Sequence, residues 1–133
     1  MTEETISSKS QAVFCPVEAT MNIICGKYKT LILWKLADCG TMRFSQLQKE
    51  VSSATQKMLT QQLRALEQDG LINRKVYPVI PPKVEYSLTQ KGWSVYPILE
   101  AMYHWGAEYF KEKGIEINCN MAPPKSHRKE ANQ

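Results

Sequence analysis

The fold is decided by residues 43–89, which read RFSQLQKEVSSATQKMLTQQLRALEQDGLINRKVYPVIPPKVEYSLT. Within this stretch Leu59, Leu63 and Leu66 recur at the spacing of one helix face, and Gly70 follows as a helix-ending residue. Beyond it, residues 71–77 and 83–88 are typical of two extended strands joined by a proline-rich turn. A helix followed directly by a β-hairpin is therefore expected.

A second, shorter helix is predicted just before this one. Phe44, Leu47 and Val51 lie on one face of a helix that begins near Arg43, and residues 52–54 form a tight turn. Ser53, followed three residues later by Gln56, matches a capping box at the start of the next helix. Helix, tight turn, helix and hairpin together predict a winged helix-turn-helix, an α+β fold that is mainly α.

Further helices flank this unit on both sides. Cys15-Pro16 opens one that ends near Gly26, and residues 27–37, apolar on most sides, are expected to form the central buried helix. After the hairpin, Thr89 is expected to cap one long helix that reaches Lys113 and ends at Gly114.

The helix that carries the three leucines has a polar opposite face suited to reading DNA. Its residues are hydrogen-bonding and none is acidic, which fits the donors and acceptors of the major groove. The alternative is a polar face that is only solvated. The predicted DNA-contacting residues on this helix are Thr55, Gln56, Lys57, Thr60, Gln61 and Arg64.

Cations near the hairpin extend the predicted DNA surface. Lys83 follows the Pro81-Pro82 tip, and Arg74 lies on the first strand. A rigid loop that carries a cation suits phosphate or minor-groove contact, because little ordering entropy is lost on binding. Arg43, just before the short helix, is the third candidate, with capping of a local acid as its alternative. Equally, the prolines of the hairpin could serve only to protect a sheet edge.

Several blocks of sequence resemble the HxlR-type family of winged-helix regulators. The blocks are residues 15–18, 26–29, 43–47, 57–64, 66–71, 77–78 and 81–89, with Gly92. The resemblance covers residues 14–113 and implies a DNA-binding fold related to the MarR group, a homodimer and control of transcription at a palindromic operator. It also implies a reading helix at residues 55–66 and a wing at 71–88. Tyr28 stands where the family usually has Trp.

The chain is accordingly divided into three parts. Residues 1–13 are expected to form a flexible arm, residues 14–113 the DNA-binding and dimerisation domain, and residues 114–133 a disordered basic tail.

The last predicted helix carries more apolar surface than one core requires. Val95, Leu99, Met102, Gly106 and Tyr109 form a stripe that Ile98, Trp105 and Phe110 widen. Such a band predicts a partner surface, although a single core helix with extra aromatic residues is the alternative. The predicted dimer-interface residues are Val17, Met21, Leu99, Met102, Trp105 and Tyr109.

The cysteines indicate thiol chemistry rather than metal binding. No CxxC pair or His at ligand spacing accompanies the 4 cysteines, so neither a metal site nor a cofactor is expected. Cys15 lies at a helix start, where the partial positive charge stabilises a thiolate. The family resemblance implies the same role, since several members sense oxidants or electrophiles through this position. Cys119 is a possible resolving thiol, and Cys25 and Cys39 are expected to be structural; alternatively, Cys15 only packs as a small apolar residue.

Composition excludes several other classes of protein. A chain of 133 residues with 43% hydrophobic residues and a net charge of +4 fits one globular domain and permits an acidic partner. No membrane span or signal peptide is recognisable, so a cytoplasmic location is expected. No set of catalytic residues is present, so an enzyme is not expected. The prediction is a DNA-binding regulator that acts as a repressor. Control by a small ligand between the dimer helices, or a winged helix used only for protein contact, remain as alternatives.

Overall fold

A computed structural model describes residues 15–117 of the chain. The arm predicted for residues 1–13 lies outside the described residues, as do residues 118–133 of the predicted tail, including Cys119. Within the described part, Gly114 ends the last helix and residues 115–117 have no regular secondary structure.

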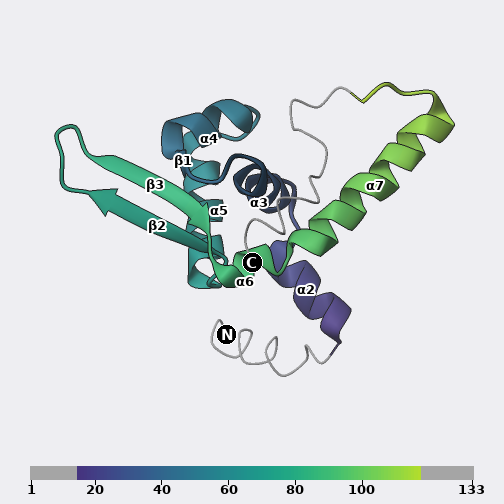
Figure 1. The fold of residues 1–133 in the computed structure, drawn as a ribbon, viewed down its shortest axis with the longest axis horizontal. Coiled ribbons are helices and arrows are strands. Elements are labelled where there is room, and N and C mark those ends of the chain that lie inside the picture. The colour runs from purple at the N-terminus through teal and green to yellow at the C-terminus, as the bar shows by residue number, and fades with distance from the viewer. Residues whose placement is uncertain (1–14, 118–133) are drawn as a thin grey trace, which may run out of the picture.

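The described chain folds as the predicted winged helix-turn-helix (Figure 1). Its helix-turn-helix comprises the short helix α4 and the longer helix α5, and the wing follows at once. The helices are α2 (Pro16–Ile24), α3 (Lys27–Cys39), α4 (Phe44–Glu50), α5 (Gln56–Gln68), α6 (Gln90–Trp93) and α7 (Tyr96–Lys113), and the strands are β1 (Met42–Arg43), β2 (Ile72–Tyr77) and β3 (Lys83–Leu88).

The wing is part of a three-stranded antiparallel sheet in the order β1-β3-β2. Strands β2 and β3 pair from Ile72 opposite Leu88 to Tyr77 opposite Lys83. Strand β1, which pairs Arg43 with Glu85, was not expected, because two residues are too few to show a strand period. Its pairing fixes the start of α4 to the middle of the wing.

Helix α3 is the centre of the core, as its sequence predicts. Ile32, Leu33 and Leu36 are fully buried, and α3 packs against α5, β3 and α7. Trp34 stacks on Tyr96 and Tyr103 of α7, with ring centroids 5.7 and 5.8 Å apart. These contacts join the helix-turn-helix and α7 into one unit.

The capping box expected at Ser53 is wrong. The N-cap of α5 is Thr55, two residues later, and its hydroxyl accepts a hydrogen bond from the Met58 amide at 3.1 Å. Ser53 stays in the turn, where its carbonyl accepts a hydrogen bond from the Tyr28 hydroxyl at 3.2 Å. Thr55 therefore serves as the cap that satisfies the free amides at the start of α5.

The single helix expected after Thr89 is in fact two. Thr89 caps α6 by accepting a hydrogen bond from the Gly92 amide at 2.9 Å, and α7 begins at Tyr96. Pro97 in the first turn of α7 has no N–H to donate to the turn before, which interrupts the helix. The break turns Val95 and Leu99 into the core, where they are 8% and 2% exposed.

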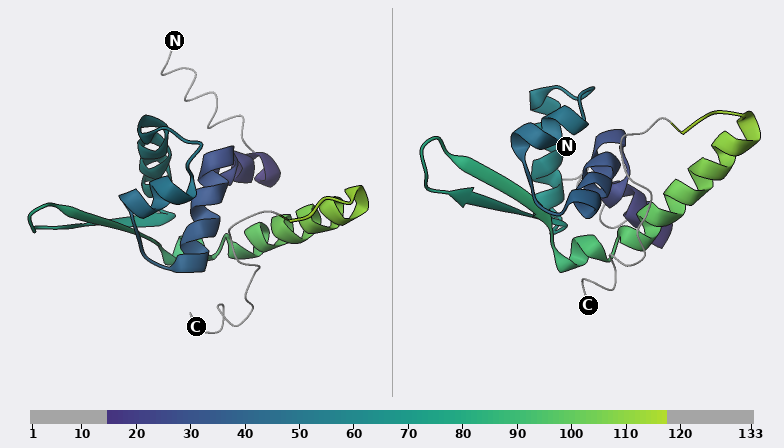
Figure 2. Two further views of the ribbon diagram at one scale, coloured as in Figure 1. Left: turned by 90° about the horizontal axis from the view of Figure 1, so that it is seen from above. Right: turned by 45° about the horizontal axis from the view of Figure 1, so that its top comes forward.

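The wing and the C-terminal half of α7 project in opposite directions from the body (Figures 1 and 2). The α7 end lies on the side away from the wing, and α2 also lies on that side. Among the described helices, none combines the length and apolar character needed to cross a membrane.

Candidate nucleic-acid interface

Helix α5 has the two faces that its sequence predicts. Leu59, Leu63 and Leu66 are buried against the core. The opposite face consists of polar residues that are exposed apart from Thr60, which is half-buried and whose hydroxyl donates to the Gln56 carbonyl at 2.8 Å. The exposed members are Thr55, Gln56, Lys57, Gln61 and Arg64. This face offers side-chain donors and acceptors to solvent along the N-terminal half of the helix.

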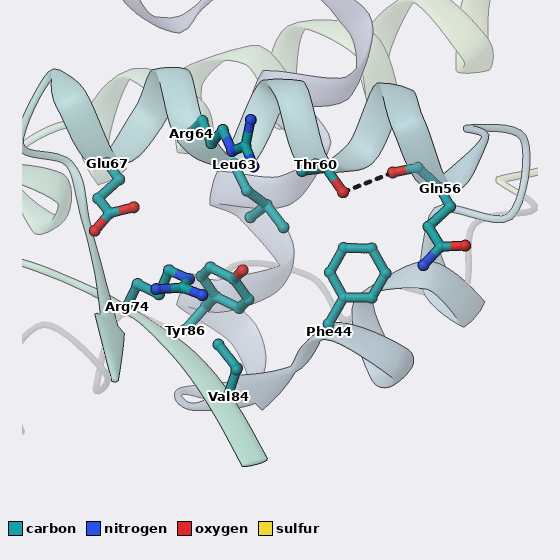
Figure 3. A pocket seen from close by; sticks show the side chains of 9 residues that line it. All are labelled: Phe44, Gln56, Thr60, Leu63, Arg64, Glu67, Arg74, Val84 and Tyr86. Atoms are coloured by element: carbon teal, nitrogen blue, oxygen red, sulfur yellow. Dashed lines mark hydrogen bonds between the residues drawn. The ribbon is translucent and has the colours of Figure 1, made fainter. Parts of the chain in front are cut away.

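A groove of about 430 Å³ lies between α5, the start of α4 and the middle of the wing (Figure 3). Its lining combines apolar and aromatic side chains, such as Phe44 and Tyr86, with the polar Gln56 and Thr60 of α5. Arg64 and Glu67 line it from α5, and Arg74 lines it from β2. The structure therefore places Arg74 on β2, as expected, with its side chain beside α5.

The two faces of the wing carry different groups because side chains alternate along a strand. Arg74, Val84 and Tyr86 line the groove beside α5. The alternate positions on the paired strands carry Lys75 and Tyr77 opposite Glu85 and Lys83, respectively. Glu85 is also the partner of Arg43 across the β1–β3 ladder.

These alternate residues form a charge cluster on the wing. The ammonium of Lys83 lies 3.4 Å from one Glu85 oxygen, and the Tyr77 hydroxyl donates to the other at 2.8 Å. The ammonium nitrogens of Lys83 and Lys75 lie 4.7 and 4.9 Å from the centroid of the Tyr77 ring. The bond from Tyr77 lowers the pKa of Glu85 from its ordinary value of 4.5; partial burial opposes this, while Lys83 and Arg43 add to it.

Sequence reasoning identified Lys83 and Arg43 but missed Glu85 and Tyr77. The sequence did contain a signal for this cluster. Lys83 and Glu85 are two residues apart on one strand and so share a face, and Tyr77 ends the strand before the turn, across from Lys83. The cluster shows that Lys83 is held by a carboxylate of its own strand.

A second cleft, of about 510 Å³, lies between the start of α4 and the wing tip. Arg43 and Lys83, far apart in sequence, both line it because β1 pairs with β3. Val79, Ile80 and the two prolines at positions 81 and 82 form its outer wall. The structure thus brings the predicted Arg43 and Lys83 to one place.

Cys15 lies at the start of α2, as expected. It is exposed, has extended backbone and precedes Pro16 in the first turn. Cys25 is half-buried, whereas Cys39 is exposed and does not pack in the core as its expected structural role requires. Within residues 15–117, no three His, Cys, Asp or Glu side chains gather closely enough to hold a metal ion.

An exposed apolar band remains on α2 and α7, opposite the wing. Val17 is 66% exposed and Trp105 is 71% exposed, and Trp105 stacks on Tyr109 with ring centroids 5.7 Å apart. Leu99 is not part of this band: the break before α7 turns it inward, so its assignment to the partner surface is corrected. The exposed residues of the predicted interface are Val17, Met21, Met102, Trp105 and Tyr109.

Comparison with known proteins gives consistent matches to this architecture. The HxlR-like helix-turn-helix family matches residues 23–114. An HTH-type transcriptional regulator of Methanothermobacter thermautotrophicus is 54% identical over 95 residues, which are 71% of this chain and 72% of that protein. Among solved structures, the HTH-type transcriptional regulator YtcD is 49% identical with a TM-score of 0.70, over 74% of this chain and 99% of that one. The redox regulator HypR in its reduced form is 46% identical with a TM-score of 0.68, over 71% and 92%.

Proposed function

The chain belongs to the HxlR-like helix-turn-helix family of transcriptional regulators, and from this premise we propose that it represses transcription by binding a palindromic operator as a homodimer. The observation that carries the proposal is the exposed face of α5, which bears Lys57, Gln61 and Arg64 over a leucine core. A helix with this face fits the major groove, where such side chains pair with base edges.

Each group of the interface has a separate task in the proposed complex. Gln61 and Arg64 contact base edges, whereas Thr55 and Lys57 at the start of α5 lie near the phosphate backbone. Arg74 supports α5 from the groove beside it, and Arg43 and Lys83 bind phosphates from the second cleft. Base contacts then supply the sequence preference, and the cations supply most of the salt-sensitive affinity.

The proposed dimer accounts for the apolar band on α2 and α7. Burial of Trp105, Tyr109 and Met102 against a second copy removes apolar surface from water. A twofold axis through this band leaves both wings free, since the wing projects the other way (Figure 2). Two α5 helices then contact two half-sites about one DNA turn apart, roughly 34 Å.

A footprint on the DNA that flanks the gene tests this function directly. Two protected half-sites with twofold symmetry are expected, with affinity that falls as salt rises. Gln61→Ala should lose discrimination between the protected sequence and unrelated duplex, because it removes a base contact without removing a charge. A protein with no salt-sensitive affinity for any duplex is not a DNA-binding regulator, and the proposal then fails.

We further propose that Cys15 senses oxidants or electrophiles. Two observations favour it: the thiol is exposed at a helix start, and HypR, a redox regulator, is 46% identical over most of this chain. In this reaction the Cys15 thiol of one subunit and the Cys119 thiol of the other form a disulfide. Their two hydrogens pass to the N=N bond of a diazene oxidant such as diamide, which becomes a hydrazine. The cross-link changes the dimer geometry and releases the operator.

Diamide treatment distinguishes control by oxidation of Cys15 from control by a bound small molecule. Non-reducing gels should show a cross-linked dimer in the wild type and none in Cys15→Ser or Cys119→Ser, with operator release in parallel. Release that persists in Cys15→Ser contradicts thiol sensing by this residue. Release by a small molecule in that variant would instead favour a ligand site between the dimer helices.

A further inference from the structure

The tip of the wing carries exposed apolar side chains. Ile80 is 100% exposed and Val79 is 50% exposed. Isoleucine is among the residues most often buried in folded proteins, and Ile80 adds nothing to this core. A single exposed apolar residue is ordinary, so its surroundings decide whether it has a role.

Those surroundings are stiff and hold two cations, Arg43 and Lys83, beside the single carboxylate of Glu85. Ile80 shares the second cleft with Arg43 and Lys83, whose charges are suited to phosphates. Pro78 lies before Ile80, and Pro81 and Pro82 follow it, so the tip loses little conformational entropy when it is fixed in a complex. An apolar side chain is thus held at the end of a rigid arm, with cations behind it.

We propose that Ile80 enters the minor groove of the operator and wedges between two base pairs, while Arg43 and Lys83 hold the adjacent phosphates. This inference rests on the proposed DNA-binding function and adds a residue that reads DNA deformability. Apolar wedges of this kind unstack a base step and kink the duplex toward the major groove.

The wedge predicts a preference for particular base steps under the wing tip. Pyrimidine–purine steps such as TA and CA unstack most easily, so they are favoured there without any hydrogen bond to a base. The gain comes from removal of the Ile80 side chain from water, which offsets part of the unstacking.

The affinity test uses duplexes that the wild-type protein selects from a random pool. Ile80→Ala removes one methylene and two methyl groups from the wedge and should weaken binding to the selected duplex at least about ten-fold. Ile80→Lys should also weaken it while strengthening low-salt binding to unrelated duplex, because it removes the wedge and adds a charge. Ile115→Ala, an exposed apolar residue beyond α7, is the matched control and should bind as the wild type does.

The bending test measures the end-to-end distance of the selected duplex by fluorescence energy transfer. The wild type should shorten it, and Ile80→Ala should shorten it less at saturating protein. Wild-type affinity and bending in Ile80→Ala, or tighter binding of Ile80→Lys to the selected duplex, overturn the wedge. If the wedge is overturned in this way while Gln61→Ala loses discrimination, the proposed DNA-binding function stands without the wedge. If the wild-type protein selects no duplex, the proposed function and the wedge both fail.

Discussion

Lys35 is a charged residue buried where α3 packs against α4 of the helix-turn-helix. It lies on α3, and its ammonium is 3.2 Å from a carboxylate oxygen of Glu50 on α4, with the two side chains 7% and 31% exposed. A buried cation is tolerated only while it is paired. The ion pair therefore links the central helix α3 to the short helix α4, which precedes α5.

Removal of the carboxylate should destabilise the protein more than removal of both charges. We expect Glu50→Gln to lower the free energy of unfolding by about 1–3 kcal/mol, because Lys35 then lacks its counter-ion. The double variant Lys35→Met, Glu50→Gln should recover most of that loss. Urea unfolding measures both, and a double variant no more stable than Glu50→Gln would contradict the pairing.

Gly92 permits the close packing of α6 on the base of the wing. A Cβ atom built there collides with the Leu71 carbonyl oxygen and lies 3.2 Å from the Leu88 side chain. Gly92→Ala should therefore destabilise the fold by about 1–3 kcal/mol, since backbone must move to relieve the clash. Gly106→Ala is the matched helical control, because its Cβ meets nothing within 4 Å in the single chain. Thermal unfolding compares them, and equal effects of the two changes would contradict this account.

Glu85 gives the wing a contribution to stability that depends on pH. Because its pKa is lowered in the folded protein, the charged carboxylate stabilises the fold above its ordinary value of 4.5, and this contribution disappears as the pH falls through the lowered value. We expect wild type to be more stable than Glu85→Gln near neutral pH, with the difference shrinking in the acid range. Denaturant midpoints across that range measure it; a difference that does not change with pH would refute the expectation.

At the scale of elements, residues with a strong period were predictable and short or interrupted elements were not. The leucine spacing of α5 and the alternation of β3 gave correct elements, because many residues repeat one preference. β1 is too short to show alternation, and Thr55 and Ser53 are equally good caps until tertiary packing sets where α5 begins. Pro97 does indicate a helix break in the sequence, yet the apolar stripe continues across it and favours one helix.

In the candidate site, too, the residues fixed by a regular period were predictable and those placed by tertiary packing were not. The polar face of α5 was predictable, because burial of its leucines fixes what points outward. Glu85 lies two residues from Lys83 on the same strand and could have been proposed as its partner, whereas the places of Tyr77, Lys75 and Arg43 around it depend on how three strands pair. Leu99 was placed at the partner surface because helical spacing shows an apolar face without showing which neighbour covers it.

The corrected cap of α5 has a measurable consequence. Thr55→Ala should destabilise the protein by about 1 kcal/mol, because it removes the side-chain oxygen that accepts from the Met58 amide. Ser53→Ala should have a smaller effect, since the hydrogen bond from Tyr28 reaches the Ser53 carbonyl and not its hydroxyl. Urea unfolding of both variants decides which residue caps the helix. A larger loss at Ser53 would restore the capping box.

At the scale of the whole molecule, the proposed DNA-binding surface and the apolar band of α2 and α7 lie on opposite sides. The wing and α5 face one way, and the exposed end of α7 extends the other way (Figure 1). A change in the apolar band therefore leaves the proposed DNA-contacting side chains in place. In the proposed complex it should alter only how many copies of α5 contact the operator at once.

Trp105→Glu tests that separation. A carboxylate in place of a 71% exposed indole should not unfold the chain, but it should convert the proposed dimer to a monomer by placing a charge in an apolar interface. Loss of the second subunit removes half of the phosphate contacts, so the slope of log affinity against log salt should fall to about half. Sedimentation and salt-series gel shifts measure the two effects, with Ile115→Glu as the control for an added charge. A Trp105→Glu protein that stays dimeric and binds the operator with an unchanged slope would place the subunit contact elsewhere.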